Sequence, residues 1–240
     1  MGFLKRLFRN VFRDGQAPVD RQSSFERLSE EELEAHLGIV KYGDFVLTEA
    51  VRPSYDLQVV PTQGFRHDTY RDQETGATVP VIMATASAGR LFELFLDLLE
   101  PLGCEADVVL ETSHHATRRG HTDLYRENID LPVLKSILCE YEEMLLDDGC
   151  TGIAVLNPAI PLEVQLDEHK MIIVYGENLK PFEAIFREHG VMLKEQMKFI
   201  TEAEHVHSSS EQFYGQFQEL QTRLGMDGYE CERDHSSGAH

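Results

Sequence analysis

The chain lacks the cysteine patterns that are typical of disulfide frameworks and of many metal sites. It has four cysteines, Cys104, Cys139, Cys150 and Cys231, and no two of them stand at CxxC spacing. Three lie beside or inside apolar segments, where a thiol is usually a small core residue. We therefore expect a reducing compartment, the cytoplasm, and no disulfide bonds.

Long hydrophobic runs are missing too. No uninterrupted apolar segment reaches the roughly 18 residues of a membrane-spanning helix, and arginines break the first apolar segment, which is therefore not typical of a secretory signal. The chain also has no GxSxG, HExxH or GxGxxG motif. No motif is specific enough to identify a reaction or a cofactor. A transition metal is the one cofactor that the histidines of the chain make possible.

Positive charge is scarce in this protein. Lysine and arginine number 22 against 42 aspartates and glutamates, which gives a formal net charge of −20. Such a body repels the phosphate backbone, so we expect no nucleic-acid partner. The charge is uneven: residues 1–22 hold five basic and two acidic residues, a net +3. This asymmetry indicates a separate role for the amino terminus.

Residues 1–14 contain a cationic amphipathic helix pattern over 3–13. The basic side chains gather on one helical face and the apolar ones on the other, the apolar set being Phe3, Leu4, Leu7, Phe8, Val11 and Phe12. Such a helix suits an anionic membrane surface or a groove on a partner protein. The alternative is that it packs on its own domain. Residues 15–28 then form a linker.

The sequence after the linker predicts an α+β fold made of two tandem degenerate repeats, each with a helix, three strands, a helix and a strand. The sheet should be mostly antiparallel, with helices packed on it. The stretches 80–115 and 170–207 align with a shift of 90, which places Ile82 on Ile172 and His115 on His205. Coincidence between similar elements is the alternative interpretation. Helix 88–100 is apolar on most sides and should be central in the core.

The repeats and their connections have the following expected boundaries. The first covers 29–130 and ends in a long polar loop over 113–130, and the second covers 131–226 and includes a final helix. Residues 227–240 are poor in apolar side chains and should form a disordered tail. A polar connection as long as 113–130 inside a compact fold is often functional.

The predicted polar loop is a basic island in an acidic protein. Its cationic and titratable residues are His114, His115, Arg118, Arg119, His121 and Arg126. Arginine forks recognise phosphate or carboxylate groups, so the island is a candidate binding site for an anionic ligand or an acidic partner segment. Pairing with nearby acidic residues of the same chain is the alternative.

Histidines at the ends of both repeats are candidate metal ligands. His205 and His207 should point to one side of a strand, and His115 could approach them if the repeats pack about a pseudo-twofold axis. Imidazole with carboxylate suits Zn, Mn or Fe. His121 and Asp123 could complete this site, and Glu202 or Glu204 could act as its general base. The alternative is solvated histidines at strand ends.

Two functions follow from these patterns. The first is a non-catalytic binding, adaptor or chaperone-like protein with a protein partner, tethered to a membrane or an assembly through its amino-terminal helix. The order of elements is similar to that of small secretion-chaperone-type domains, which are also acidic, and this resemblance implies a binding role. The second is a metal-dependent hydrolase-like enzyme that uses the histidines and glutamates at the repeat ends.

Overall fold

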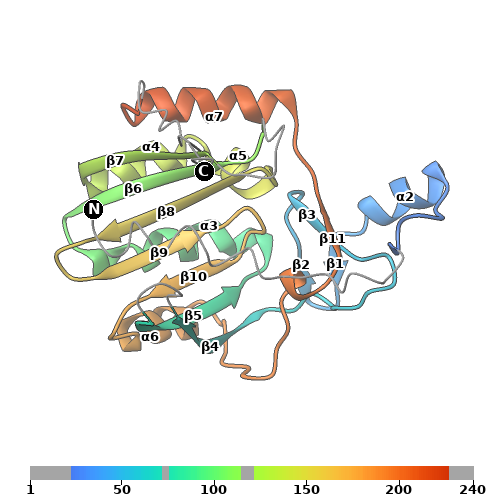
Figure 1. The fold of residues 1–240 in the computed structure, drawn as a ribbon, viewed down its shortest axis with the longest axis horizontal. Coiled ribbons are helices and arrows are strands. Elements are labelled where there is room, and N and C mark those ends of the chain that lie inside the picture. Colours follow the sequence, from blue (N-terminus) through green and yellow to red (C-terminus); the bar gives the residue numbers. More distant parts are fainter. Residues whose placement is uncertain (1–22, 72–75, 115–121, 227–240) are drawn as a thin grey trace, which may run out of the picture.

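The computed structural model describes residues 23–71, 76–114 and 122–226. Within them, a mostly antiparallel sheet carries helices, as an α+β fold requires (Figure 1). The α-helices are α2 (Glu30–Leu37), α3 (Ala88–Leu98), α4 (Leu131–Cys139), α5 (Glu142–Asp147), α6 (Lys180–Glu188) and α7 (Glu211–Arg223). Two short 3₁₀ helices are η1 (Glu100–Leu102) and η2 (Ile200–Glu202).

Seven strands form the main sheet, and each is antiparallel to its neighbours. In spatial order they are β4 (Gly64–Arg71), β5 (Thr78–Thr85), β10 (Ile172–Tyr175), β9 (Leu162–Leu166), β8 (Thr151–Asn157), β6 (Glu105–Thr112) and β7 (Thr122–Asp130). The central strands are buried along nearly their whole length, as their continuous Val and Ile runs predict.

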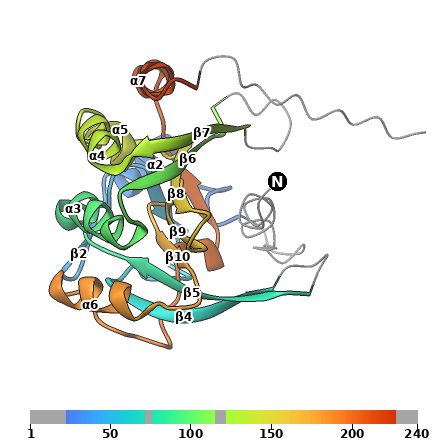
Figure 2. The ribbon, with the colours of Figure 1, turned by 90° about the vertical axis from the view of Figure 1, so that its left-hand side faces the viewer.

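Helices α3, α4, α5 and α6 lie on one face of the sheet, with α7 beside α5 (Figure 2). The largest apolar cluster lies between these helices and the strands, and α3 contributes Leu91, Phe92, Leu94, Phe95 and Leu98 to it. The predicted central position of this helix is therefore confirmed. A second apolar cluster, which includes Val109, Ile173 and Tyr175, lies on the opposite face of the sheet.

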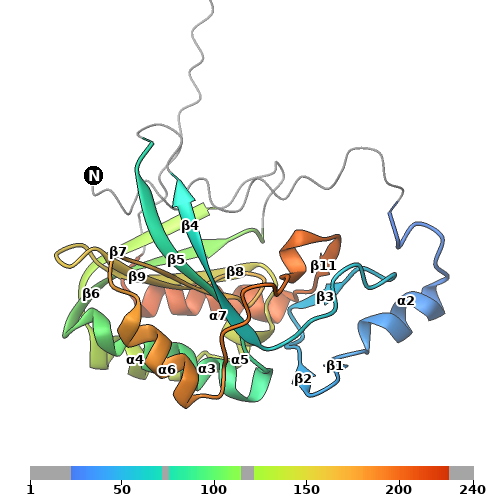
Figure 3. The same cartoon turned by 90° about the horizontal axis from the view of Figure 1, so that it is seen from below.

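A small two-stranded ribbon stands apart from the main sheet. It pairs β3 (Val51–Pro53) with β11 (His205–His207), and it lies near α2 and a second short hairpin, β1 (Lys41–Tyr42) with β2 (Phe45–Val46) (Figure 3). The backbone N–H of Gly149, just before β8, donates to the carbonyl of Ser208 at 2.7 Å. This bond joins the ribbon to one end of the main sheet.

Strand register brings several connections to that same end. Thr112 at the end of β6 pairs with Thr151 at the start of β8, and Leu166 at the end of β9 pairs with both Ile153 and Ile172. The segment after β6, the segment before β8 and the β9–β10 turn therefore lie together beside the ribbon. Polar side chains collect here.

The structure does not confirm the tandem repeat. The stretch 80–115 yields β5, α3 and β6, and the stretch 170–207 yields β10, α6 and β11. Strands β5 and β10 are neighbours, and α3 packs on α6. The closing strands differ, however: β6 has eight residues inside the main sheet, whereas β11 has three in the separate ribbon.

Another correction concerns the predicted polar loop over 113–130. Residues Thr122–Asp130 form strand β7, which pairs along its length with β6. The strand has few buried side chains, among them Leu124 and Ile129, because it lies at the edge of the sheet. A polar edge strand carries little of the apolar alternation that identifies a strand in a sequence, so this stretch resembles a polar loop when only the sequence is considered.

Candidate metal centre

The turn between β9 and β10 fixes the position of His169. Oδ1 of Asp167 accepts hydrogen bonds from the backbone N–H groups of His169 and Met171, at 3.1 and 2.7 Å. Lys170 has a φ of 60°, a left-handed conformation that non-glycine residues rarely adopt and that recurs at functional sites. Its ammonium donates to the carbonyl of Thr151 at 2.7 Å, so the turn is also tied to β8.

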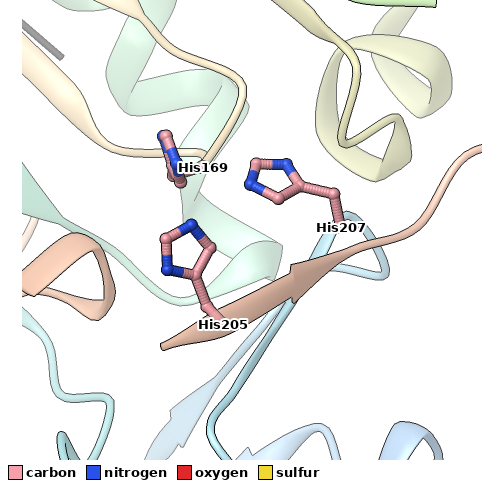
Figure 4. Close-up of side chains that lie close together, drawn as sticks. All are labelled: His169, His205 and His207. Atoms are coloured by element: carbon pink, nitrogen blue, oxygen red, sulfur yellow. The ribbon is translucent and has the colours of Figure 1, made fainter. Parts of the chain in front are cut away.

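The two other histidines stand on the ribbon. His205 pairs with Pro53 and His207 pairs with Val51 in the β3–β11 register. Because successive strand residues point to opposite sides, His205 and His207 share one side of β11. Their ring centroids lie 5.1 Å apart, so the two rings do lie together on that side, as the sequence predicts. Figure 4 shows the two rings facing His169, which comes from the β9–β10 turn.

A buried arginine holds the ribbon in place. Arg52 lies on β3 and is 2% exposed. Its guanidinium donates to the backbone carbonyls of Leu37, Thr48 and Val51, at 2.7, 2.6 and 2.9 Å, and it also pairs with Glu49. A guanidinium spreads its donors in a rigid fork, and here the fork joins α2, the loop before β3 and β3 itself.

The three rings form a compact cluster, which we call the three-histidine cluster: His169, His205 and His207. One donor atom from each ring lies within 4.8 Å of a donor atom of each of the others. The ring centroids are 4.7 to 5.1 Å apart. Zinc binds imidazole nitrogen at about 2.0–2.1 Å, so small ring movements suffice for all three to reach one ion.

Hydrogen bonds set the tautomer of each ring. Nδ1 of His169 lies 2.8 Å from Oδ2 of Asp167, Nδ1 of His205 lies 2.8 Å from the Ala203 carbonyl, and Nδ1 of His207 lies 2.6 Å from the Gly149 carbonyl. Carbonyl and carboxylate oxygens only accept, so each Nδ1 carries the proton. Each Nε2 is then the nitrogen left for a metal. Metal-binding histidines in proteins typically have this outer hydrogen bond.

The electrostatics favour neutral rings on the ribbon. Burial lowers the pKa of His205 to about 4, and burial together with nearby His169 also lowers the pKa of His207. Both imidazoles are therefore neutral at pH 7, the form that binds metal. For His169, burial alone would lower the pKa, but the carboxylates of Asp167 and Glu168 outweigh it and raise the pKa.

A carboxylate and a pocket adjoin the cluster. Glu168 acts electrostatically on both His169 and His207, and it accepts a hydrogen bond from the Ser113 hydroxyl at 3.1 Å. A pocket beside the turn is lined by His169 and Lys170 and by the apolar or basic side chains of Phe45, Leu91, Lys198 and Phe199. His169 thus belongs both to the cluster and to the wall of this pocket.

A second group of potential ligands lies nearby: His114, Asp148 and Cys150, which we call the cysteine cluster. One donor atom from each also lies within 4.8 Å of the others. Nε2 of His114 is 3.1 Å from Oδ2 of Asp148, and the two side chains are 7% and 0% exposed. Gly149, whose carbonyl holds His207, lies between Asp148 and Cys150 in the chain, so the two clusters adjoin the same loop.

The predicted metal ligands are only partly brought together. His115 and His121 lie outside the described residues. Asp123 stands on β7 opposite Glu111 and is not among the grouped ligands of the described residues. The third histidine of the cluster is His169, which the sequence analysis missed.

Each of the two predicted general bases, Glu202 and Glu204, is bonded to a residue outside the cluster. Glu202 forms an ion pair with Arg66 at 2.7 Å, and Glu204 accepts a hydrogen bond from the backbone N–H of Ser24 at 2.8 Å. Both carboxylates are thus held by other partners. Among the described residues, Glu168 is a better candidate, because it acts on two of the three histidines.

The predicted basic island is not a surface in the described part of the chain. Of its members, only His114 and Arg126 lie within the described residues, and His114 is buried against Asp148. Arg126 pairs with Val108 in the β6–β7 ladder, four positions from Thr112, roughly 13 Å at the usual rise of a strand. The two side chains therefore do not form one site. Arg118 and Arg119 lie outside the described residues, as does the segment 3–13.

Comparison of the chain with protein-family models, curated proteins and solved structures found no match. The functional argument therefore rests on the geometry of the site. In the described residues, no helix has both the length and the apolar character needed to cross a membrane.

Proposed function

We propose that this protein is a zinc-dependent hydrolase whose metal is bound by Nε2 of His169, His205 and His207. The observation that carries the proposal is the set of three outer hydrogen bonds, which leaves the Nε2 atoms of converging rings as the remaining donors. A structural zinc site usually has four protein ligands, whereas three histidines leave a fourth position for water or substrate.

The chemistry follows from this open position. Zinc lowers the pKa of bound water to about 7 and polarises carbonyl or phosphoryl oxygens, so it supplies a nucleophile at neutral pH. Glu168 is the carboxylate that we assign as proton acceptor. The pocket that His169 lines has room for only about one water molecule, so the substrate itself would bind at the open zinc position. Esters and phosphoesters are the substrate classes that this arrangement favours.

The test begins with metal content. Untagged protein is loaded with zinc, passed through a desalting column and analysed for bound metal, together with His169→Ala, His205→Ala and His207→Ala. Each substitution should remove one equivalent of zinc. His189→Ala is the matched control, because His189 also bonds a carboxylate, that of Asp97 at 2.8 Å, but directly follows α6, outside the cluster. Retention of all the zinc in the three variants would refute the centre.

Activity is then measured on a panel of esters and phosphoesters. Hydrolysis should be lost on treatment with a chelator, return with zinc, and be absent in His205→Ala. If the protein binds zinc but hydrolyses no member of the panel, the zinc site stands and the hydrolase assignment is wrong. The adaptor function remains a prediction, because it depends on residues 1–14 and on the loop residues outside the described part of the chain.

A further inference from the structure

The geometry points to a second metal site, formed by Nε2 of His114, a carboxylate oxygen of Asp148 and the thiolate of Cys150. Histidine nitrogen, carboxylate oxygen and cysteine sulfur are the three ligand types that zinc takes in proteins. All three come from segments that the strand register places at one end of the sheet. This site goes beyond the three-histidine centre, and it has sulfur where that centre has none.

Backbone pairing builds the site. The β6–β8 ladder continues one step past its last residue pair, since the N–H of Ser113 donates to the Cys150 carbonyl at 2.9 Å. This bond brings His114, the next residue, beside Asp148 and Cys150. Asp148 also shapes its own loop, because Oδ1 accepts the N–H of Cys150 at 3.1 Å. The three ligands are therefore positioned by the main chain and not by flexible surface segments.

His114 is oriented from its outer nitrogen. Nδ1 lies 2.7 Å from Oγ1 of Thr112, and Nε2 faces inward to Asp148 at 3.1 Å and to the hydroxyl of Ser209 at 3.2 Å. Because carboxylate oxygens only accept, Nε2 of His114 carries a proton here, unlike the Nε2 atoms of the three-histidine cluster. Ser209 also donates to Asp148. A metal would replace the contact between Nε2 and the carboxylate, and the Ser209 hydroxyl or a water could fill the fourth position.

Binding releases protons. The Cys150 thiol loses its proton to solvent as the sulfur–zinc bond forms. Nε2 of His114 also gives up its proton, which leaves the ring proton on Nδ1, where it is donated to Oγ1 of Thr112, and the ring binds through the lone pair of Nε2. No electron is transferred, and zinc remains divalent. Since a coordinating thiol is deprotonated outright by the ion, the resting protonation of Cys150 does not prevent binding.

The two sites would be coupled through one loop. Gly149 lies between Asp148 and Cys150, and its carbonyl holds Nδ1 of His207. A metal in the cysteine cluster would therefore fix the outer partner of a ligand in the three-histidine cluster. The expected consequence is that zinc binds more tightly to the three-histidine cluster when the second site is filled.

Cobalt(II) is the probe that separates the sites, because only a thiolate ligand gives a sulfur-to-cobalt charge-transfer band in the near ultraviolet. The full chain, stripped of metal and kept reduced, is titrated with cobalt(II). We expect the band in the wild-type protein and in His205→Ala. In Cys150→Ser the band should be absent, and the variant should bind one equivalent of metal fewer than the wild type. The combined variant Cys104→Ser, Cys139→Ser and Cys231→Ser is the matched control and should keep the band.

A measurement on the unaltered protein covers the case in which Cys150→Ser does not fold. Zinc X-ray absorption of the fully loaded wild-type chain should show a sulfur neighbour at about 2.3 Å in addition to nitrogen and oxygen at about 2.0 Å. Only nitrogen and oxygen neighbours, or a cobalt band that persists in Cys150→Ser, would overturn the site. Either result would leave the proposed three-histidine centre standing. Failure of that centre would give a different result: the sulfur ligation would be intact, but the protein would bind one equivalent of metal fewer than expected.

Discussion

Oδ2 of Asp167 lies 2.8 Å from Nδ1 of His169, and the other oxygen of the same carboxylate closes the turn on which that histidine stands. One side chain thus shapes the β9–β10 connection and orients the ring. The carboxylate also makes the imidazole more basic, which strengthens its bond to a metal.

Asp167→Asn should therefore weaken zinc binding while leaving the fold intact. The amide oxygen can still accept the turn hydrogen bonds, but the negative charge beside Nδ1 is lost. Loss of the outer hydrogen-bond partner of a metal-binding histidine typically lowers metal affinity 10–100-fold, and we expect a decrease of about this size here. Competition with a chromophoric chelator measures the change. An affinity equal to that of the wild type would show that Asp167 serves the turn alone.

Glu168→Gln separates metal binding from proton transfer. If Glu168 accepts the proton of zinc-bound water, the variant should keep its zinc and lose about 10²–10⁴-fold in kcat, the usual contribution of a general base. Steady-state hydrolysis and metal content of the same preparation test this. Glu202→Gln is the control, since that carboxylate pairs with Arg66. Equal kcat values in Glu168→Gln and the wild type would contradict the assignment.

The structure explains why the sequence predicted part of the site. His205 and His207 alternate with Val206, and this spacing places both rings on one side of any strand, whichever strand it pairs with. Helix α3 was equally predictable, since apolar residues cover most of its surface. Both inferences depend on local periodicity alone.

His169 could not be found in this way, because its contribution depends on contacts between distant segments. It stands 36 residues before His205 in the numbering of the chain, and only the ribbon brings the two together. The local signal was the polar turn from Asp167 to Lys170 between two apolar strands. The same holds for Cys150. Its spatial neighbour His114 is 36 residues away in the chain, and the β6–β8 register brings the two together.

Arg52→Leu tests whether the ribbon positions the histidines. The substitution leaves the carbonyls of Leu37, Thr48 and Val51 without their donor, and each buried polar group left unsatisfied costs about 1–3 kcal/mol. We expect a marked loss of stability in chemical denaturation and loss of zinc from the three-histidine cluster. Retention of zinc at wild-type affinity would show that β11 does not need this support.

Phe95→Ala tests the core beneath the sheet. Phe95 is fully buried on α3, so its truncation should cost about 3–5 kcal/mol of the free energy of unfolding. Leu96→Ala, on the same helix at a half-buried position, should cost less. Urea denaturation followed by circular dichroism gives both values. Equal and small losses would contradict the central placement of α3.

Glu111 should make stability depend on pH. Burial, together with the carboxylates of Asp123, Asp167 and Glu168, raises the pKa of Glu111 to about 8, above its ordinary value of 4.5. A carboxyl whose pKa is higher in the folded state binds its proton more tightly there. Its contribution is therefore fully present below about pH 4.5 and is lost progressively as the pH rises to about 8.

Glu111→Gln removes this dependence, because the amide does not ionise and keeps a polar group beside Gln165, which bonds Glu111 at 3.3 Å. Relative to the wild type, the variant should gain stability between pH 5 and pH 8, at up to about 1.4 kcal/mol per pH unit. Above pH 8 the difference should level off. Melting temperatures of metal-free protein across this range give the answer, and Glu105→Gln, at the other end of β6, is the control. Parallel curves for Glu111→Gln and the wild type would show that the carboxyl ionises normally in the folded protein.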